Sequence, residues 1–492
     1  MTPMNGQPFL MAGTGQEIAM DQRTVLPTNQ LRARLVSLLG ALELGLVERR
    51  QIVRLCLLAA LAGEHTLLIG PPGTAKSELA RRLHAVFRDA RYFERLLTRF
   101  SVPEELFGPL SIKALEEDRY ERHTIGFLPD ASVAFIDEVF KANSAILNAL
   151  LTLLNEREFD NGSGRQRCPL ITAIGATNEV PEDAVAEAFF DRFLVRVPVE
   201  PVSAAAFGRL LETGRGASWA HPLPAMCLDA ADLAALNQAA AQVSLPSDVN
   251  AVLGELRNQF AADQTYVSDR RWVKIVHLLR MAAASEERPT VLIWDLLLLP
   301  WCTGPDVPRQ AAVSDWLQTR LGVRATFSPP RLRRVVEAFE AQLDVELKAN
   351  DLDYDESGRL RFSASELAQD IGDAKGGANA SRMTYNRQRR YGKLHIAARG
   401  GQIDQLLARI DSYADELADQ SRSLATYCAG SLWMDSGLTE RISANLTATV
   451  EAIVNLRHRA AKARDGFLGL PKLSGDNGDI PEPVDHEPLS DV

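Results

Sequence analysis

The sequence predicts an α/β protein with a parallel sheet between helices, followed by a part built from helices alone. Two short apolar runs predict the sheet, because each suits a buried strand. A glycine-rich loop and then a helical pattern follow the first run, and two carboxylates and then a helical pattern follow the second. From about residue 203 the apolar residues recur at helical spacing, which predicts the second part. The 492 residues allow about three domains, each with a core of its own.

The first apolar run leads into a glycine-rich loop. Residues 65–77 read HTLLIGPPGTAKS, and the loop consists of Gly70, Pro71, Pro72, Gly73, Thr74, Ala75, Lys76 and Ser77. A strand, such a loop and a helix in this order are typical of a phosphate-binding loop, whose backbone N–H groups and helix N-terminus surround the phosphates. Lys76 would reach the terminal phosphates, and the Ser77 hydroxyl would bind Mg²⁺. Ala75 replaces the usual second glycine, and we expect helical backbone there to tolerate its methyl group.

The second apolar run, residues 133–136, ends in Asp137 and Glu138. Open parallel sheets bind ligands at the carboxyl ends of their strands. Asp137 would hold Mg²⁺, and Glu138 would polarise the attacking water. Two adjacent carboxylates are also common in solvated turns, but after a phosphate-binding loop they predict a nucleoside triphosphatase.

Three further residues are site candidates, and each also has a plainer interpretation. Asn178 follows the buried strand at 170–176 and could orient the water, or it could simply close a turn. Arg192 lies between a short helix and the last strand, where it could reach a neighbouring subunit's nucleotide or be a surface cation. Arg270 begins the third of four short helices and could contact the γ-phosphate, or it could be one of two exposed arginines.

Composition excludes several classes of protein. The net charge of −10 argues against a broad electrostatic surface for nucleic acid, so no nucleic-acid partner is expected from composition. The five cysteines have no C-x-x-C spacing, so neither zinc nor a disulfide framework is indicated. The N-terminus lacks the features of a signal peptide, and the densest apolar run, 291–299, is too short for a transmembrane segment. We therefore expect a cytoplasmic protein.

The domain organisation can be predicted from these patterns. We expect a nucleotide-binding domain over 1–202 with an insert at 111–130, an all-helical lid over 203–300, a discontinuous helical domain over 301–347 plus 401–468, an insert over 348–400, and a disordered tail over 469–492.

The second insert offers two motifs. Asp351, Asp353 and Asp355 imitate the start of a calcium loop, but Glu356 and Phe362 stand where Gly and Glu are required, so calcium is not expected. A basic and aromatic cluster could contact a partner or nucleic acid, or could be a mobile charged loop; it consists of Arg382, Tyr385, Arg387, Arg389, Arg390, Tyr391 and Lys393.

With these motifs in this order, the first 300 residues resemble MoxR-type AAA+ ATPases. The segments GPPGTAKS, FIDEVFKANSAILNALLTLLNERE, GATNE, FFDRF and SDRRW are similar to the RavA branch. The resemblance implies that Glu138 is the catalytic base, Asn178 sensor one, Arg192 the arginine finger and Arg270 sensor two, with a helix-two insert within 111–130. It also accounts for Ala75, since the family often has alanine there.

The C-terminal resemblance is weaker. The segment LATYCAGSLWMDSGLTERISANLTATVEAIVNLRHRA is similar to the C-terminal helices of that branch. The insert differs from the branch's larger one, which binds an inducible lysine decarboxylase, so that partner is not inferred. The wider family implies a partner with a von Willebrand factor A domain.

Together, the residues and the resemblance predict an ATPase that uses ATP and Mg²⁺ as a homo-oligomer, expected to be a hexamer. Hydrolysis would remodel, mature or activate a client protein that the sequence does not identify. Three alternatives stay open: a motor that inserts a metal cofactor into a metalloenzyme, a DNA-acting motor, and a scaffold controlled by nucleotide.

Overall fold

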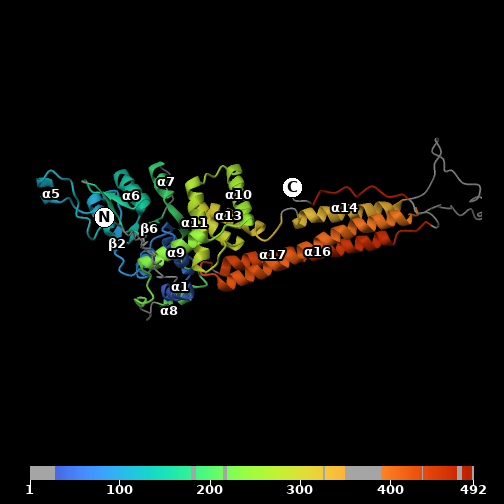
Figure 1. The fold of residues 1–492 in the computed structure, drawn as a ribbon, viewed down its shortest axis with the longest axis horizontal. Helices are drawn as coiled ribbons and strands as arrows, with labels where there is room; N and C mark the ends of the chain where they lie inside the picture. The colour runs from blue at the N-terminus through green and yellow to red at the C-terminus, as the bar shows by residue number, and fades with distance from the viewer. Residues whose placement is uncertain are drawn as a thin grey trace, which may run out of the picture.

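The computed structural model describes residues 28–162, 164–178, 184–213, 219–324, 327–349, 389–434, 436–473 and 479–489. Within them, a body of one parallel sheet and shorter helices carries three long helices that extend away from it (Figure 1).

The body is built on a parallel sheet of five strands in the order β2-β3-β6-β1-β7. The strands are β1 (His65–Ile69), β2 (Tyr92–Leu96), β3 (Val133–Asp137), β6 (Thr172–Thr177) and β7 (Phe193–Pro198). All neighbours pair in parallel, and β6 lies between β1 and β3. The predicted α/β fold with a parallel sheet is therefore confirmed.

Helices cover both faces of this sheet. Successive residues of a strand point to opposite faces, and accordingly Leu68 belongs to the core under the first helices while Leu67 belongs to a second core under α6. The covering helices are α1 (Thr28–Glu43), α2 (Arg50–Leu61), α3 (Lys76–His84), α6 (Ser144–Glu156) and α7 (Ala184–Phe190). Because both faces are covered, the central strands are buried almost throughout.

The predicted insert at 111–130 lies at the end of the body (Figure 1). It contains α5 (Ile112–Glu116) and the 3₁₀ helix η1 (Leu128–Asp130), and it follows α4 (Pro103–Phe107). A small hairpin of β4 (Glu158–Asp160) and β5 (Arg165–Arg167) supports it, since the Arg122 N–H donates to Asn161 Oδ1 at 2.7 Å. The insert is thus tied to the segment that follows α6.

The helical region after β7 contains the four predicted lid helices and more. Its elements are α8 (Phe207–Thr213), α9 (Ala230–Gln242), α10 (Ser247–Ala262), α11 (Asp269–Ser285), η3 (Ile293–Leu298), α12 (Leu299–Thr303) and α13 (Val307–Arg320). The fourth predicted helix, near 290–299, is a 3₁₀ helix that leads into α12. Pro300 sits in the first turn of α12, where its missing N–H costs nothing.

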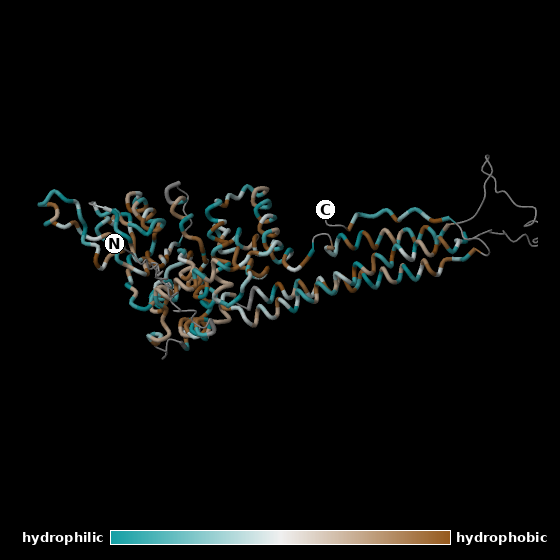
Figure 2. The backbone as a smooth tube through the Cα atoms, in the orientation of Figure 1, coloured by the Kyte–Doolittle hydropathy of each residue, from teal (hydrophilic) through white to brown (hydrophobic). Residues whose placement is uncertain are grey.

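We call the three long helices that leave the body the arm. They are α14 (Pro329–Lys348), α16 (Lys393–Gly430) and α17 (Ser436–Leu468), and α17 packs against both of the others. The 38 residues of α16 correspond to a length of about 57 Å. This helix begins at Lys393, inside the region predicted as an insert. Figure 2 shows hydrophobic and hydrophilic residues alternating along the arm, as in amphipathic helices.

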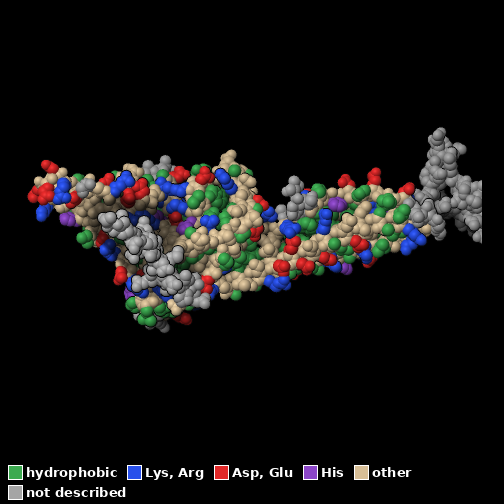
Figure 3. All heavy atoms as spheres, in the orientation of Figure 1, with side chains coloured by type: hydrophobic (Ala, Val, Ile, Leu, Met, Phe, Trp, Pro, Cys, Tyr) green, Lys and Arg blue, Asp and Glu red, His purple; other side chains and the backbone are tan. Residues whose placement is uncertain are grey.

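The surface of the arm carries charges of both signs, which are interspersed on the face seen in Figure 3. Pairs between helices include Arg459 with Glu340 at 2.6 Å and Arg457 with Asp411. Because they are largely exposed, such pairs contribute little to stability, and buried apolar residues hold the arm together.

Residues 479–489 differ from the expected disordered tail. They lie extended beside α14, where Glu487 pairs with Arg331 at 3.1 Å and with Arg334 at 2.7 Å. Leu489 is buried in the apolar core of the arm. The composition of the tail suggested disorder, but the ring of His486 lies 5.6 Å from that of Phe339 on α14, and ion pairs with α14 hold the segment as well.

Two expectations lie outside the described residues. They are the calcium-loop imitation at 351–362 and the part of the basic cluster that precedes Arg389. Among the residues that the structure does describe, no helix is both long and apolar enough to cross a membrane.

Candidate nucleotide-binding site

Three strand ends bring the predicted site residues together. The loop follows β1, Asp137 and Glu138 end β3, and Asn178 follows β6, which lies between the other two strands. The Asn178 Nδ2 donates to Glu138 Oε1 at 2.7 Å, and Lys76 Nζ lies 3.4 Å from Asn178 Oδ1. The sheet topology thus places an ammonium, an amide and a carboxylate in one contact chain.

The loop has the conformation of a backbone cradle rather than of a helix start. Gly73 and Ala75 both have positive φ, +80° and +67°, and α3 begins only at Lys76. The expectation of helical backbone at Ala75 is therefore wrong, because this residue is left-handed and makes the turn into the helix. Gly70 has a different role: a Cβ there would lie 2.1 Å from the Val199 carbonyl oxygen, so only glycine fits.

Lys76 is a buried cation that faces two carboxylates. Its side chain donates to the Gly70 carbonyl at 2.5 Å, and the residue is only 7% exposed. Burial lowers the pKa of Lys76, while Asp137 and Glu138 oppose that shift. A buried ammonium at a helix N-terminus is a site for an anion, and the loop N–H groups add to it.

Glu138 is held in position by its neighbours. Its backbone is left-handed, with φ of +52°, which turns the side chain away from the strand direction. Besides Asn178, Lys141 contacts it, with Nζ 3.3 Å from Oε2. The side chain is 16% exposed, so a water molecule can reach it. The sequence did not indicate Lys141, although its place three residues after Glu138, on a short 3₁₀ turn, is a possible signal.

Arg49 is a second residue that sequence reasoning missed. It is 5% exposed and donates from Nε to the Thr74 carbonyl at 3.2 Å and from Nη2 to the Glu200 carbonyl at 2.7 Å. Burial lowers the pKa of Arg49. Next to it, Glu48 accepts from both the N–H and the hydroxyl of Ser203. These contacts fasten the loop to the start of α2 and to the segment after β7.

The donor set fits ATP with Mg²⁺. Lys76 and the loop N–H groups suit phosphates, and the Ser77 hydroxyl and Asp137 are oxygen ligands of the kind that Mg²⁺ takes from proteins. Asp137 Oδ1 accepts from the Glu138 N–H at 3.0 Å, which fixes the orientation of that carboxylate. Among the described residues there is no separate cluster of His, Cys, Asp and Glu suited to a metal.

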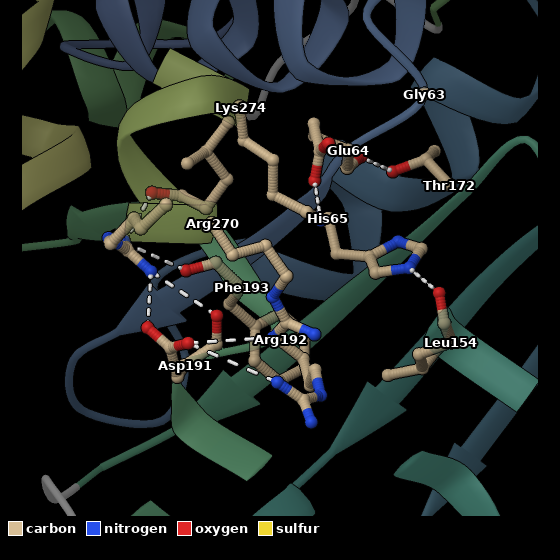
Figure 4. Close-up of polar contacts among 12 residues, drawn as sticks. Gly63, Glu64, His65, Leu154, Thr172, Asp191, Arg192, Phe193, Arg270 and Lys274 are labelled. Carbon is tan, nitrogen blue, oxygen red and sulfur yellow. Dashed lines mark hydrogen bonds and ion pairs between the residues drawn. The ribbon is translucent and has the colours of Figure 1, made fainter. Parts of the chain in front are cut away.

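Arg192 and Arg270 lie near the amino ends of the strands, whereas the loop, Asp137 and Asn178 lie at the carboxyl ends. Phe193 begins β7 and pairs with His65, the first residue of β1, whereas the loop follows the last residue of β1. The backbone of Arg192 is therefore a strand length, about 13 Å, from the loop. Its guanidinium lies 4.0 Å from Asp191, and Arg270 lies 3.5 Å from the same carboxylate (Figure 4).

The lid helix α11 is fixed at this same end of the strands. Lys274 Nζ donates to Glu64, which precedes β1, at 2.6 Å (Figure 4). The structure thus joins Lys76, Asp137, Glu138 and Asn178 in one group and Arg192 with Arg270 in another. Arg270 thus lies with Asp191 before β7, away from the loop of the same chain.

Comparison with known protein families is consistent with this geometry. Residues 33–238 match the model described as the MoxR domain in the MoxR-vWA-beta-propeller ternary systems, and residues 248–317 match that of the AAA lid domain. The two matches support a MoxR-family AAA+ ATPase, and the second extends beyond residue 300, where we expected the lid to end.

Two uncharacterized proteins of Methanocaldococcus jannaschii are similar to this chain. One is 40% identical over 255 residues, or 51% of this chain and 65% of the relative; the other is 41% identical over 239 residues, or 48% and 62%. The chain thus spans slightly less than two thirds of either relative. A solved structure of a candidate ATPase from Cytophaga hutchinsonii aligns with a TM-score of 0.47 and 17% identity, covering 56% of this chain and 87% of that one.

Proposed function

Starting from the MoxR-family AAA+ ATPase module in residues 33–238 and 248–317, we propose that this protein hydrolyses ATP with Mg²⁺ at sites shared between subunits of a ring. Lys76, Ser77 and Asp137 hold the nucleotide and the metal ion. Glu138 is the catalytic base, and Asn178 is sensor one. The observation that carries the proposal is the contact chain from Lys76 through Asn178 to Glu138 at the carboxyl edge of the sheet.

The environment of Glu138 suits a general base. Two donors, Asn178 Nδ2 and Lys141 Nζ, hold its carboxylate oxygens, so the side chain is positioned before reaction. Bound Mg²⁺ would neutralise charge that develops on the phosphates. Glu138 takes the proton from the attacking water, and Lys76 stabilises negative charge on the terminal phosphate.

A second subunit supplies the remaining groups. Arg192 and Arg270 lie across the sheet from their own loop, so we assign them as arginine finger and sensor two acting on the neighbour's nucleotide. An arginine finger is worth about 10³ to 10⁵ in rate. This head-to-tail arrangement closes into a ring, and we propose a hexamer from the family resemblance.

The output of hydrolysis is a change in a protein partner. We propose that the chain belongs to the RavA branch, on the segment SDRRW, and that it remodels, matures or activates a cytoplasmic client. The description of the matching MoxR model names vWA and beta-propeller systems, which supports a partner with a von Willebrand factor A domain. The insert at 111–130 and the arm are the candidate contact surfaces.

The dependence of the ATPase rate on protein concentration tests the shared site. We expect the rate per subunit to rise as subunits associate, and Arg192→Ala to lower it by about 10³-fold or more. Arg309→Ala, which alters an exposed arginine elsewhere in the lid, is the matched control and should leave the rate unchanged. A flat rate that Arg192→Ala does not alter would mean that each subunit works alone.

Two further variants test the roles within one subunit. Glu138→Gln should bind ATP normally but hydrolyse it slowly, because the amide cannot accept the proton. Lys76→Ala should weaken ATP binding itself. Near-normal turnover by Glu138→Gln would refute the assignment of the base.

A further inference from the structure

Asp191 is surrounded by more positive charge than it can neutralise. Four guanidinium groups lie around it, those of Arg192 at 4.0 Å, Arg196 at 3.8 Å, Arg270 at 3.5 Å and Arg271 at 3.2 Å. Within the described part of the chain, the buried Nε atoms of Arg192 and Arg196 have no hydrogen-bond partner. The cluster therefore has charge in excess, and the side chains of Arg192 and Arg270, which are 20% and 45% exposed, can present it to an anion from outside the subunit.

The four arginines are not held equally. Arg271 is 3% exposed and donates to the carbonyl oxygens of Cys302 at 2.6 Å, Leu194 at 2.7 Å and Phe193 at 3.1 Å, as well as to Asp191 Oδ1 at 3.2 Å. By contrast, the contacts of Arg192 and Arg270 with Asp191 are longer than a hydrogen bond. Arg271 is thus fixed, whereas Arg192 and Arg270 are loosely paired.

The contacts of Arg271 join three parts of the chain. It projects from α11, and it bonds to the end of α12 and to the start of β7. One turn further along α11, the Lys274–Glu64 pair attaches the same helix to the residue that precedes β1 (Figure 4). These bonds fix where Arg270, the residue before Arg271, lies relative to Arg192, which comes from the other domain.

We propose that Arg271 and Asp191 are positioning residues that hold Arg192 and Arg270 at the spacing required to meet the nucleotide phosphates bound by a second copy of this chain. Arg271 anchors the Asp191 carboxylate and the start of α11. Asp191 in turn pairs loosely with the two phosphate-facing arginines, which can exchange it for the phosphates of the neighbour. The inference rests on the proposed function, since it presumes a site shared between subunits.

Mixing two inactive variants separates the two roles of a subunit. A Glu138→Gln subunit cannot hydrolyse ATP but can donate its arginines, whereas an Arg192→Ala subunit has an intact base but cannot donate the finger. Their mixture should regain activity at sites where the first donates to the second. If this mixture stays inactive, the nucleotide sites are not shared between subunits, and the proposed roles of Arg271 and Asp191 are refuted as well.

The role of Arg271 is then tested in the donor. Glu138→Gln combined with Arg271→Lys should restore at least tenfold less activity to Arg192→Ala subunits than Glu138→Gln alone. The matched control combines Glu138→Gln with Arg280→Lys on the same helix, where the buried arginine Nε has no hydrogen-bond partner among the described residues, and it should restore activity fully. Equal restoration by the Arg271 and Arg280 combinations would overturn the proposal.

The reverse mixture distinguishes positioning from misfolding. Arg271→Lys subunits that keep Glu138 should hydrolyse ATP at the restored rate when mixed with excess Glu138→Gln donors, because their own nucleotide site is intact. Loss of activity in both directions would show a general folding role and would also overturn the proposal. Asp191→Asn, which keeps an oxygen for Arg271 but removes the charge, is the second variant and should show the same one-directional defect.

Discussion

His65 illustrates how the interior of the sheet fixes the state of a single side chain. The residue is 2% exposed, its Nδ1 accepts from the Ala173 N–H at 3.0 Å, and its Nε2 lies 2.9 Å from the Leu154 carbonyl oxygen. Nε2 therefore carries the proton and donates to Leu154, and a second proton on Nδ1 would break the bond from Ala173. Burial lowers the pKa of His65 well below its usual 6.5.

This pKa shift predicts a loss of stability in mild acid. In the unfolded chain the imidazole takes up a proton near pH 6.5, while in the folded protein it stays neutral. The free energy of unfolding should therefore be constant on this account above pH 6.5 and fall below it, by up to about 1.4 kcal/mol per pH unit. Urea unfolding at pH 7.5, 6.5 and 5.5 measures the effect.

The matched variants for this test are His65→Gln and His458→Gln, the latter at an exposed histidine on α17. Each removes one imidazole, so only the first should reduce the difference in unfolding free energy between pH 7.5 and 5.5. The same pH dependence in His65→Gln as in the wild type would contradict the prediction.

At this scale the sequence predicted residue identities better than conformations. The loop, the carboxylates and Asn178 could be placed because strand ends in a parallel sheet share one edge. The left-handed backbone of Ala75 could not, because an alanine there costs about 1–2 kcal/mol and local propensity argues against it. Arg49 was missed since its contacts depend on segments brought together only by folding, whereas the contact of Lys141 is local and depends on the left-handed backbone of Glu138 and the 3₁₀ turn after it.

At the scale of elements, the segment 479–489 behaves as a strap along α14. Leu489 is 5% exposed, and the ring of His486 lies 5.6 Å from that of Phe339. Arg399 donates to the Glu482 carbonyl at 2.7 Å, which ties the segment to α16 as well. Side chains rather than a ladder of backbone hydrogen bonds hold it, so we expect it to open locally without unfolding the arm.

Leu489→Ala should release this strap. Burying a leucine side chain contributes about 1.5–3 kcal/mol, so its loss should raise the open population about tenfold or more. A protease that cleaves on the N-terminal side of aspartate should then cut the Val484–Asp485 bond correspondingly faster, with little change in the thermal midpoint of the body. Ile480→Ala, at a residue 72% exposed in the same segment, is the control and should be cleaved at the wild-type rate. Equal rates for the two variants would show that Leu489 does not hold the strap.

Element positions were largely predictable, and boundaries less so. The arm helices fall largely within the helical ranges predicted, 301–347 and 401–468, because amphipathic spacing persists over many turns. The start of α16 was placed too late because the glycine-rich composition of 348–400 favours a loop, yet Gly400 at its end lies inside the helix. Tertiary packing overrides the low helix propensity of glycine.

At the scale of the whole molecule, the arm packs against the body through the turn between α16 and α17. The turn between α16 and α17 lies against α2 and α11: Trp433 is 1% exposed and donates to the Ser285 hydroxyl at 2.9 Å. Arg54 of α2 donates to the Met434 carbonyl at 3.0 Å. This contact could not be predicted from sequence, because it joins segments about 380 residues apart.

The start of α2 also lies next to the glycine-rich loop at 70–77. Arg49, immediately before α2, donates to the Thr74 carbonyl. In the next turn, Arg54 donates to the Met434 carbonyl in the turn between α16 and α17. A single rigid helix therefore contacts both the loop and the turn at Trp433. We predict that the arm and the nucleotide site are energetically coupled through α2, which would let a partner bound to the arm alter ATP affinity.

A double-mutant cycle between Trp433→Phe and Arg49→Lys measures this coupling. Trp433→Phe keeps most of the ring but loses the bond to Ser285, and Arg49→Lys keeps the charge but cannot bond to both carbonyls. If α2 transmits the change, the two effects on the dissociation constant of ATP should be non-additive by more than about 0.5 kcal/mol, a factor of about 2.3. Trp316→Phe, at a partly buried tryptophan of the lid, replaces Trp433→Phe in the control cycle and should add to Arg49→Lys within that limit. Additive effects in both cycles would mean that the turn at Trp433 stabilises the body but is not energetically coupled to ATP binding.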